Sequence, residues 1–453
     1  MAISSLLVIA GAVFAGTRVF NKTRSKQPDV EATRTPHDEV TTDKTTAMAL
    51  VSLGVASVGS LAKVPLVGMA TLPVTLYVLS PALKHTWQKL RKERRVDDQA
   101  LVSGRMAVYL VFNYPVIAAL DATLYSYSKR YFLQRETQFR RKLLQQNLPA
   151  PVIEQMLEQS SETQRIGERY SDRTVPWMLA TFTLTLPLLG PNLAAAFLTT
   201  NFGGHLRKLV PHTGNRFLAE ALEQGVIALH VDALERLSCA DIILIDESVL
   251  VVEHSGANDQ QWLRVLRNQH AAQYYLVSHQ DKRVSDNLMN ALGFDNCISS
   301  SEQAHTIQNL QQSGHRICVI DSSGDSDAVI GSVVLSTAEL SDSLVSTDYV
   351  RMQLATESLA QLPEVFALAK TFSAKQQFNL KAPILIDLVD ISSTLLIDLG
   401  LVYSVLFTYS GLAVGVINSR ISGNDHETAS YPETNLKPIK QWREAQHDKP
   451  FPK

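Results

Sequence analysis

Charged residues are almost excluded from several long stretches of this chain and cluster at the ends of those stretches. From Thr46 to Leu83 the only charged side chain is Lys63, and Lys63-Val-Pro65 divides the stretch into two apolar halves. A strongly basic segment, His85–Arg95, follows soon after. Because lysine and arginine concentrate on the cytoplasmic side of membrane helices, this pattern predicts a tight helical hairpin with its exit in the cytosol. An amphipathic surface helix is the alternative for the basic exit alone.

Three later stretches share this design, and each contains a point where a helix is expected to break. They are Ala100–Tyr127, broken near Asn113-Tyr-Pro115, Thr174–Thr200, broken at Gly190-Pro191, and Pro383–Asn418, hinged near Gly400. Basic residues flank the first two on both sides, so a hairpin keeps both flanks in the cytosol. A single crossing is the alternative for the first stretch, although it would place one basic flank outside.

The two ends of the chain differ from its middle. Ile3–Gly16 is apolar but short, and basic residues follow it rather than precede it. A signal peptide carries its charge before the apolar core, so we expect an uncleaved membrane anchor, with a cleaved signal as the alternative. Gln27–Lys44 is expected to be a polar linker, and the polar, proline-containing tail from Ile421 is expected to be disordered.

A different pattern lies between the last two hairpins. Short apolar runs at Ile242–Ile245, Tyr274–Val277 and Ile317–Ile320 alternate with helical patterns at Val284–Leu292 and Glu302–Gln312. Alternation of strands and helices predicts a Rossmann-like parallel sheet. The expected fold class is therefore a polytopic α-helical membrane protein with one cytosolic, Rossmann-like α/β domain.

The expected domain organisation follows from these patterns. The segments are an N-terminal membrane anchor (1–20), a polar linker (21–45), two membrane hairpins (46–134), a cytosolic helical insert (135–173), a membrane hairpin (174–206), the cytosolic α/β domain (207–378), a C-terminal membrane hairpin (379–420) and a disordered polar tail (421–453).

Bulk composition excludes several classes of protein. The net charge of −2 gives no global field that would attract nucleic acid. Cys239, Cys297 and Cys318 are too widely spaced for a disulfide framework or a zinc pattern, and reduced thiols facing the cytosol fit them best. We expect a multi-pass protein of the inner or plasma membrane whose soluble domain is cytoplasmic, with the lipid bilayer as a partner and no nucleic acid.

One carboxylate stands where catalytic carboxylates lie in parallel sheets. The apolar run Ile242–Ile245 delivers Asp246 at its end, and Glu247-Ser-Val-Leu250 follows. The carboxyl ends of parallel strands are where such sheets place their functional groups. A strand-end residue kept for helix capping or packing is the structural alternative.

The order of hairpins around the α/β region, together with local motifs, resembles the heavy-metal-transporting P-type ATPases. The stretch from Leu234 through Asp246 is similar to the approach to the family's phosphorylated aspartate. The order and spacing of the motifs over residues 46–421 carry the resemblance, which implies that the α/β region is a haloacid-dehalogenase-type P-domain. The other matching segments are Arg165–Trp177, Gly225–Ile227, Ala233–Leu237, Gly314–Ile320, Thr347–Met352 and Gly415–Ile421.

The departures from the family concern phosphoryl chemistry. The family continues its aspartate with Lys-Thr-Gly-Thr, whereas this chain has Glu247 at the lysine and Ser248 and Val249 at the threonine and glycine. A carboxylate there repels phosphate, and valine hinders the approach of backbone amides. The corresponding positions for the family's Thr-Gly-Asp segment, phosphate-binding lysine and magnesium-binding segment are Ser278-His279-Gln280, about Gln303, and Asp321–Asp327 with Ser322 at the ligand position. A register shift of one residue would restore an aspartate in the last of these.

Two of the family's domains have no room in this chain. Too few residues separate Asp246 from Tyr274 for a nucleotide-binding insertion, and residues 135–173 cannot hold a β-rich actuator domain with its Thr-Gly-Glu motif. Phosphoryl transfer depends almost entirely on positioning and positive charge. We therefore expect a pseudo-ATPase, not an enzyme, with Asp246 inactive at the position of the phosphorylated aspartate and no cofactor.

The ion path also departs from the family. The family's Cys-Pro-Cys bend aligns near Phe202-Gly203-Gly204, so the thiolate ligands for soft metals are lost, and the adjacent His205 is expected at the surface rather than as a ligand. Asp387, Asp390 and Asp398, with Thr394, recur at helical spacing on one face. Carboxylates at membrane depth mark ion paths, and hard oxygen ligands suit a divalent cation such as Mg²⁺, Mn²⁺ or Fe²⁺. Pairing of these acids with Arg105 or Lys63 is the alternative.

The function expected from these features is that of a non-catalytic relative of metal-transporting P-type ATPases. It would regulate or assemble with an active metal-transporting ATPase or another membrane protein in metal-ion homeostasis. Two alternatives remain: a metal cation conduit that uses the intramembrane carboxylates, and a minimal ATP-driven transporter phosphorylated on Asp246.

Overall fold

The computed structural model describes residues 36–64, 70–93, 96–145, 153, 161–200, 204–228, 230–251, 261–279, 289, 292–321, 333–336, 350–354, 359–397 and 399–421. The chain divides into two compact units. The helical unit comprises residues 1–153, 160–216 and 375–418, and the sheet unit comprises residues 154–159, 217–374 and 419–453. The N-terminal anchor and nearly all of the polar tail expected from the sequence lie outside the described residues, as does Asp398.

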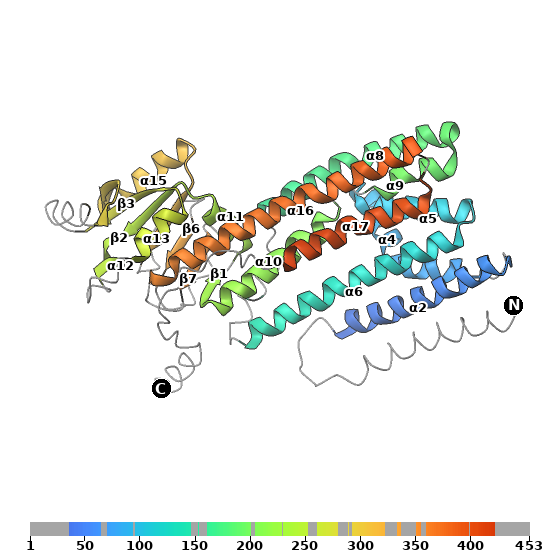
Figure 1. Cartoon of the computed structure of the whole chain (residues 1–453), viewed down its shortest axis with the longest axis horizontal. Helices are drawn as coiled ribbons and strands as arrows, with labels where there is room; N and C mark the ends of the chain where they lie inside the picture. Colours follow the sequence, from blue (N-terminus) through green and yellow to red (C-terminus); the bar gives the residue numbers. More distant parts are fainter. Residues whose placement is uncertain are drawn as a thin grey trace. The chain divides into compact units, whose positions relative to one another are not determined.

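Long helices account for the helical unit (Figure 1). They are α2 (Pro36–Leu61), α4 (Leu72–Glu93), α5 (Asp98–Val111), α6 (Pro115–Gln145), α8 (Glu162–Ala194), α9 (Ala196–Thr199), the first part of α10 (Leu206–Glu223), the later part of α16 (Leu362–Ile397), and α17 (Leu401–Arg420). Side-chain caps start two of them, because Asp97 accepts a hydrogen bond from the Gln99 amide and Ser161 accepts one from the Gln164 amide.

Several helices pass through boundaries that the sequence patterns had suggested. Helix α2 begins at Pro36, inside the segment expected to be a linker. Helices α6 and α8 each extend into the expected insert at residues 135–173, and α16 crosses residue 378. A continuous helix needs only local backbone hydrogen bonds, so a change from apolar to polar composition does not end it. The expected break does occur at Gly190, whose φ of 77° interrupts α8.

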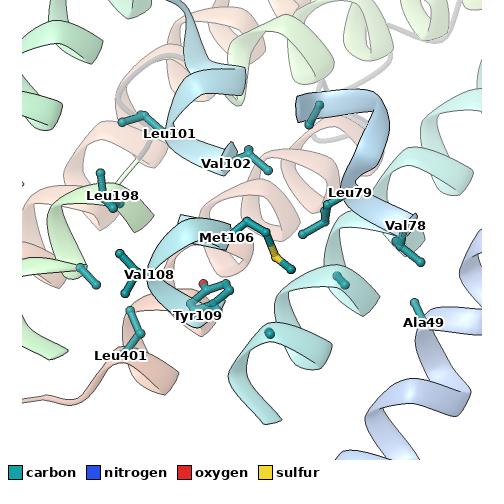
Figure 2. Close-up of a cluster of buried hydrophobic side chains, with 14 of the residues drawn as sticks. Ala49, Val78, Leu79, Leu101, Val102, Met106, Val108, Tyr109, Leu198 and Leu401 are labelled. Carbon is teal, nitrogen blue, oxygen red and sulfur yellow. The ribbon is translucent and has the colours of Figure 1, made fainter. Parts of the chain in front are cut away.

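An apolar cluster fills the interior of the helical unit (Figure 2). Its buried side chains come from α2, α4, α5, α9 and α17, among other helices, and include Leu79, Met106, Leu198 and Leu401. Helix α2 lies along α6 (Figure 1), where Thr123 on α6 donates a hydrogen bond of 3.1 Å to the carbonyl of Ala49. Segments far apart in sequence are thus joined in one core.

Gly167 permits the close approach of α8 to α10, and its replacement gives a first prediction. A Cβ atom at Gly167 would lie 2.7 Å from Leu206 Cδ1 and 2.9 Å from Leu206 Cβ, which is fixed to its own helix. Gly167→Ala is therefore expected to destabilise the helical unit by about 1–3 kcal/mol. Gly104→Ala is the matched control, because its nearest neighbour would be Leu198 Cδ1 at 3.5 Å, an ordinary contact. Thermal unfolding in detergent measures both, and equal melting temperatures for the two variants would contradict the packing described here.

The sheet unit contains a seven-stranded sheet in the order β1-β7-β6-β5-β2-β3-β4. All neighbouring strands are parallel except β1 and β7, which are antiparallel. The strands are β1 (Val226–Ala228), β2 (Ile242–Asp246), β3 (Gln273–Ser278), β4 (Asn296–Ser299), β5 (Ile317–Asp321), β6 (Val333–Ser336) and β7 (Val350–Leu354). The helices between them are α11 (Val231–Ser238), α12 (Glu247–Val251), α13 (Gln261–Gln269) and α15 (Gln303–Gln312).

The three strands expected from apolar runs are confirmed as β2, β3 and β5. Every residue of β2 and β5 is buried, which explains why their sequences are continuous apolar runs rather than alternating patterns. Each fully buried isoleucine or leucine in these strands contributes about 1.5–3 kcal/mol of hydrophobic stabilisation. The helix expected over Glu302–Gln312 is confirmed as α15, whereas the one over Val284–Leu292 lies largely outside the described residues.

Two helices in the described part of the chain are long and apolar enough to cross a membrane. They are Thr42–Leu61 in α2 and Leu401–Arg420, which is α17. Large apolar side chains are also exposed on α16 and α8, among them Leu385, Leu396 and Leu188. An exposed apolar surface of this kind is what a lipid bilayer covers.

Candidate functional site

The strand order of the sheet unit fixes where a ligand could approach it. From β2 the chain moves outward to β3 and β4, and then returns to the opposite side of β2 to form β5, β6 and β7. In open parallel sheets, ligands bind beyond the carboxyl ends of the strands at the point where the order reverses. That point lies between β2 and β5, where the pairing of Ile245 with Ile320 brings Asp246 and Asp321 to the same edge.

Asp246 is buried, and both oxygens of its carboxylate have partners. Oδ1 accepts hydrogen bonds from the backbone amide of Ser248, at 2.8 Å, and from the Ser248 hydroxyl. Oδ2 lies 2.9 Å from Nε2 of His279, a half-exposed side chain at the end of β3. The bonds from Ser248 are those of a carboxylate that caps the start of a helix, here α12.

Glu247 occupies the position directly beside this aspartate, at the first residue of α12. Its side chain is only 2% exposed. Oε2 accepts a hydrogen bond of 2.7 Å from the Ser278 hydroxyl and one of 3.2 Å from the backbone amide of His279, whereas Oε1 is buried without a hydrogen-bond partner. The carboxylate is thus held in place by the end of the neighbouring strand β3.

The remaining positions implied by the family resemblance are only partly described. Gln303 is the first residue of α15, and Asp321 is the buried last residue of β5. Ser322, Asp327 and Gln280 lie outside the described residues. Among the residues that the structure describes, no group of three His, Cys, Asp or Glu side chains has the geometry of a metal site.

The connection after Asp246 is short. Between β2 and β3 the described residues form the helices α12 and α13 and the short link 270–272, and residues 252–260 are the rest of that connection. The described parts of the expected insert at residues 135–173 are helical.

The helical unit contains two of the three aspartates predicted as metal ligands. Asp387 and Asp390 are both buried on α16, whereas the third, Asp398, is outside the described residues. Oδ1 of Asp390 lies 3.5 Å from the hydroxyl of Thr394, and Oδ2 is buried without a hydrogen-bond partner. The hydroxyl of Thr394 lies 3.2 Å from that of Ser404 on α17. Asp390 is therefore placed among hydroxyl groups.

Arg105, a candidate partner of those aspartates, pairs instead with Asp121. Arg105 Nε lies 3.1 Å from Asp121 Oδ2, and both side chains are almost fully buried. The hydroxyls of Tyr109 and Tyr409 donate hydrogen bonds of 3.0 Å and 2.9 Å to the same carboxylate. Both charged residues stand out in the sequence as the charges within the apolar stretch Ala100–Tyr127, but their mutual pairing was not predicted.

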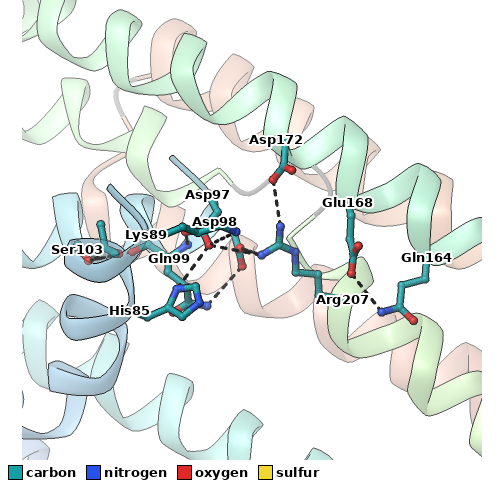
Figure 3. Close-up of polar contacts among 11 residues, drawn as sticks. His85, Lys89, Asp97, Asp98, Gln99, Ser103, Gln164, Glu168, Asp172 and Arg207 are labelled. Carbon is teal, nitrogen blue, oxygen red and sulfur yellow. Dashed lines mark hydrogen bonds and ion pairs between the residues drawn. The ribbon is translucent and has the colours of Figure 1, made fainter. Parts of the chain in front are cut away.

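A second polar network was also missed by the sequence interpretation. Arg207, near the start of α10, forms ion pairs with Asp98 and with Asp172 on α8 (Figure 3). Asp97 forms an ion pair of 3.1 Å with Lys89 (Figure 3). The sequence signal for this network was the adjacent acidic pair Asp97-Asp98, which closely follows the basic segment His85–Arg95. His205, expected at the surface, is buried, and its Nε2 has no hydrogen-bond partner.

Comparison with known proteins finds similar folds among solved structures. No family model and no curated protein matches the sequence. Two solved structures of a zinc-transporting PIB-type ATPase, in two different states, are similar to this chain at 11% sequence identity. The first gives a TM-score of 0.54 over 84% of this chain and 99% of that chain, and the second gives 0.52 over 83% and 98%.

The fold of this chain is therefore similar to that of P-type ATPases. More particularly, the chain resembles the zinc-transporting P-type ATPases, as the order of its motifs predicted.

Proposed function

We propose that this protein is a multi-pass membrane member of the P-type ATPase superfamily that does not transfer phosphate, and that it regulates or assembles with an active transporter in metal-ion homeostasis. In this proposal the sheet unit is a Rossmann-like, haloacid-dehalogenase-type P-domain in the cytoplasm. The hairpins at residues 46–134, 174–206 and 379–420 are the membrane part. The similarity to zinc-transporting ATPases supports both assignments.

The observation that carries the proposal is the immobilised carboxylate of Glu247. Ser278 and His279 hold it through two hydrogen bonds, beside the carboxylate that a phosphorylating relative would use. An aspartyl phosphate adds further negative charge at that point, and an effective catalyst would supply a cation there. Here both carboxylate oxygens of Asp246 already have partners. Oδ1 accepts a hydrogen bond from the Ser248 hydroxyl, and Oδ2 lies 2.9 Å from Nε2 of His279.

Genetic complementation tests whether the biological role needs Asp246. In cells that lack the gene and show a changed metal content, the parent protein and Asp246→Asn are expected to restore that content equally. The amide of asparagine preserves the size of the side chain but cannot form an acyl phosphate. Membrane abundance of both proteins, measured by blotting, is the control. Loss of complementation by Asp246→Asn at equal abundance would contradict a non-catalytic role.

A metal cation conduit is the second candidate function, favoured by the buried Asp387 and Asp390. In this reading the divalent cation passes along α16 and needs both carboxylates together with Asp398. A minimal ATP-driven transporter phosphorylated on Asp246 is the third candidate, favoured only by the retained aspartate at the strand end.

A further inference from the structure

No basic side chain in the described residues forms an ion pair with Asp390, in contrast to three other buried carboxylates of the helical unit. Asp121 pairs with Arg105, and Asp97 and Asp98 pair with Lys89 and Arg207. Asp390 is 0% exposed, and its Oδ2 atom has no hydrogen-bond partner. A buried carboxylate without a charged partner is costly, and such groups in membrane segments often mark ion sites.

The atoms around Asp390 are neutral oxygens from three different segments. Thr394 lies one turn further along α16, Ser404 belongs to α17, and Thr199 ends α9; all three side chains contribute polar contacts to the carboxylate. Thr199 and Ser404 are 0% exposed, and Thr394 is 1% exposed. The Thr199 carbonyl accepts a hydrogen bond of 2.8 Å from Thr408 on α17, which joins this segment to α17.

We propose that Asp390, with the hydroxyl groups of Thr394, Ser404 and Thr199, forms a binding site for one hard monovalent cation, for which Na⁺ is the probe. One carboxylate supplies the single negative charge that such an ion neutralises. The hydroxyl oxygens replace part of its water shell. The inference differs from the divalent conduit candidate in the charge of the ion, and it rests on the proposed function only in taking the helical unit as membrane-embedded.

The donor set disfavours a divalent or soft metal ion. Ca²⁺ takes about 6–8 oxygen ligands, more than the side-chain oxygens of Asp390 and the three hydroxyls supply, and zinc sites draw on histidine, cysteine and carboxylate ligands. No group of three such side chains occurs among the described residues. A divalent ion on Asp390 alone would leave a buried positive charge uncompensated.

The charged side chains on the surrounding helices include one matched pair and one further acid. Helix α5 contributes Arg105, whose charge is matched by Asp121 on α6. Arg105 also donates a hydrogen bond of 3.4 Å to the Thr199 carbonyl. On α16 itself the nearest acid is Asp387, one turn before Asp390.

The test is a Na⁺ titration of the full-length protein in nanodiscs, with ionic strength held constant by N-methylglucamine chloride. Melting temperature is the readout, because a ligand that binds only the folded state raises it. The parent protein is expected to gain several degrees as Na⁺ replaces N-methylglucamine. Asp390→Asn should lose this shift, and Ser404→Ala should move the midpoint to a higher Na⁺ concentration. Ser392→Ala is the matched control on the same helix, because its exposed hydroxyl bonds only to the Leu388 carbonyl, and it should behave as the parent.

Three outcomes would overturn the inference: no Na⁺-dependent shift in the parent, an equal shift in Asp390→Asn, or a shift produced by micromolar Zn²⁺ that Na⁺ does not reproduce. The last result would favour the divalent conduit instead. Because the titration contains neither ATP nor a partner protein, its failure is separate from a failure of the complementation experiment.

Discussion

Asp121→Ala is expected to destabilise the helical unit by about 3–5 kcal/mol, because it leaves the guanidinium of Arg105 buried without its counter-ion. The two side chains are 3% and 1% exposed. The variant also removes the acceptor for the hydroxyls of Tyr109 and Tyr409, which lie on α5 and α17. Carbonyls of Leu198 and Thr199, at 3.4 Å, would be the remaining partners of Arg105.

Thermal and denaturant unfolding in detergent micelles measure this effect. The informative control is the double variant Arg105→Met with Asp121→Leu, which removes both charges and fills a similar volume. Replacing a buried ion pair in this way is often neutral or stabilising, so the double variant should recover the part of the loss that comes from the unpaired guanidinium, while the two tyrosine hydroxyls still lack their acceptor. If Asp121→Ala unfolds at the same temperature as the parent, the pair does not hold α5, α6 and α17 together.

The sequence was sufficient to predict those elements whose signals are local. Apolar runs located β2, β3 and β5, and the Gly190-Pro191 dipeptide located the interruption in α8. Asp246 was correctly expected at a strand end because a continuous apolar run precedes it directly. The resemblance to heavy-metal P-type ATPases was found from the order of weak motifs, and the similarity of fold confirms it.

Contacts between distant segments could not be predicted in this way. The partner of Asp246 is His279, which follows a different strand, and the partner of Arg105 is Asp121 rather than an aspartate of α16. Pairing of this kind depends on helix rotation and strand register, which a single sequence does not encode in its local pattern. The helix over residues 36–45 was missed for another reason: its composition is polar, and its formation depends on the apolar part of α2 that follows.

The second prediction with a large expected effect is that this protein does not transfer phosphate, and Glu247 is the main reason to expect it. Two unit charges about 4 Å apart near a protein surface interact with an energy of about 4 kcal/mol. A glutamate in place of a lysine therefore changes an attraction of that order into a repulsion, and each ~1.4 kcal/mol of barrier is a tenfold change in rate. The short connection between β2 and β3 is a second reason to expect no phosphoryl transfer, because it leaves too few residues for a nucleotide-binding domain.

Incubation of the purified protein with radiolabelled ATP and Mg²⁺, followed by acid quenching, tests the central claim most directly. A zinc-transporting P-type ATPase serves as the positive control, and Asp246→Asn as the negative control. A parallel incubation with labelled acetyl phosphate, a donor that needs no nucleotide site, separates the effect of Glu247 from that of the short connection. The parent protein is expected to carry no more label than Asp246→Asn with either donor. Acid-stable, hydroxylamine-labile label on the parent and not on Asp246→Asn would contradict the proposed loss of phosphoryl transfer.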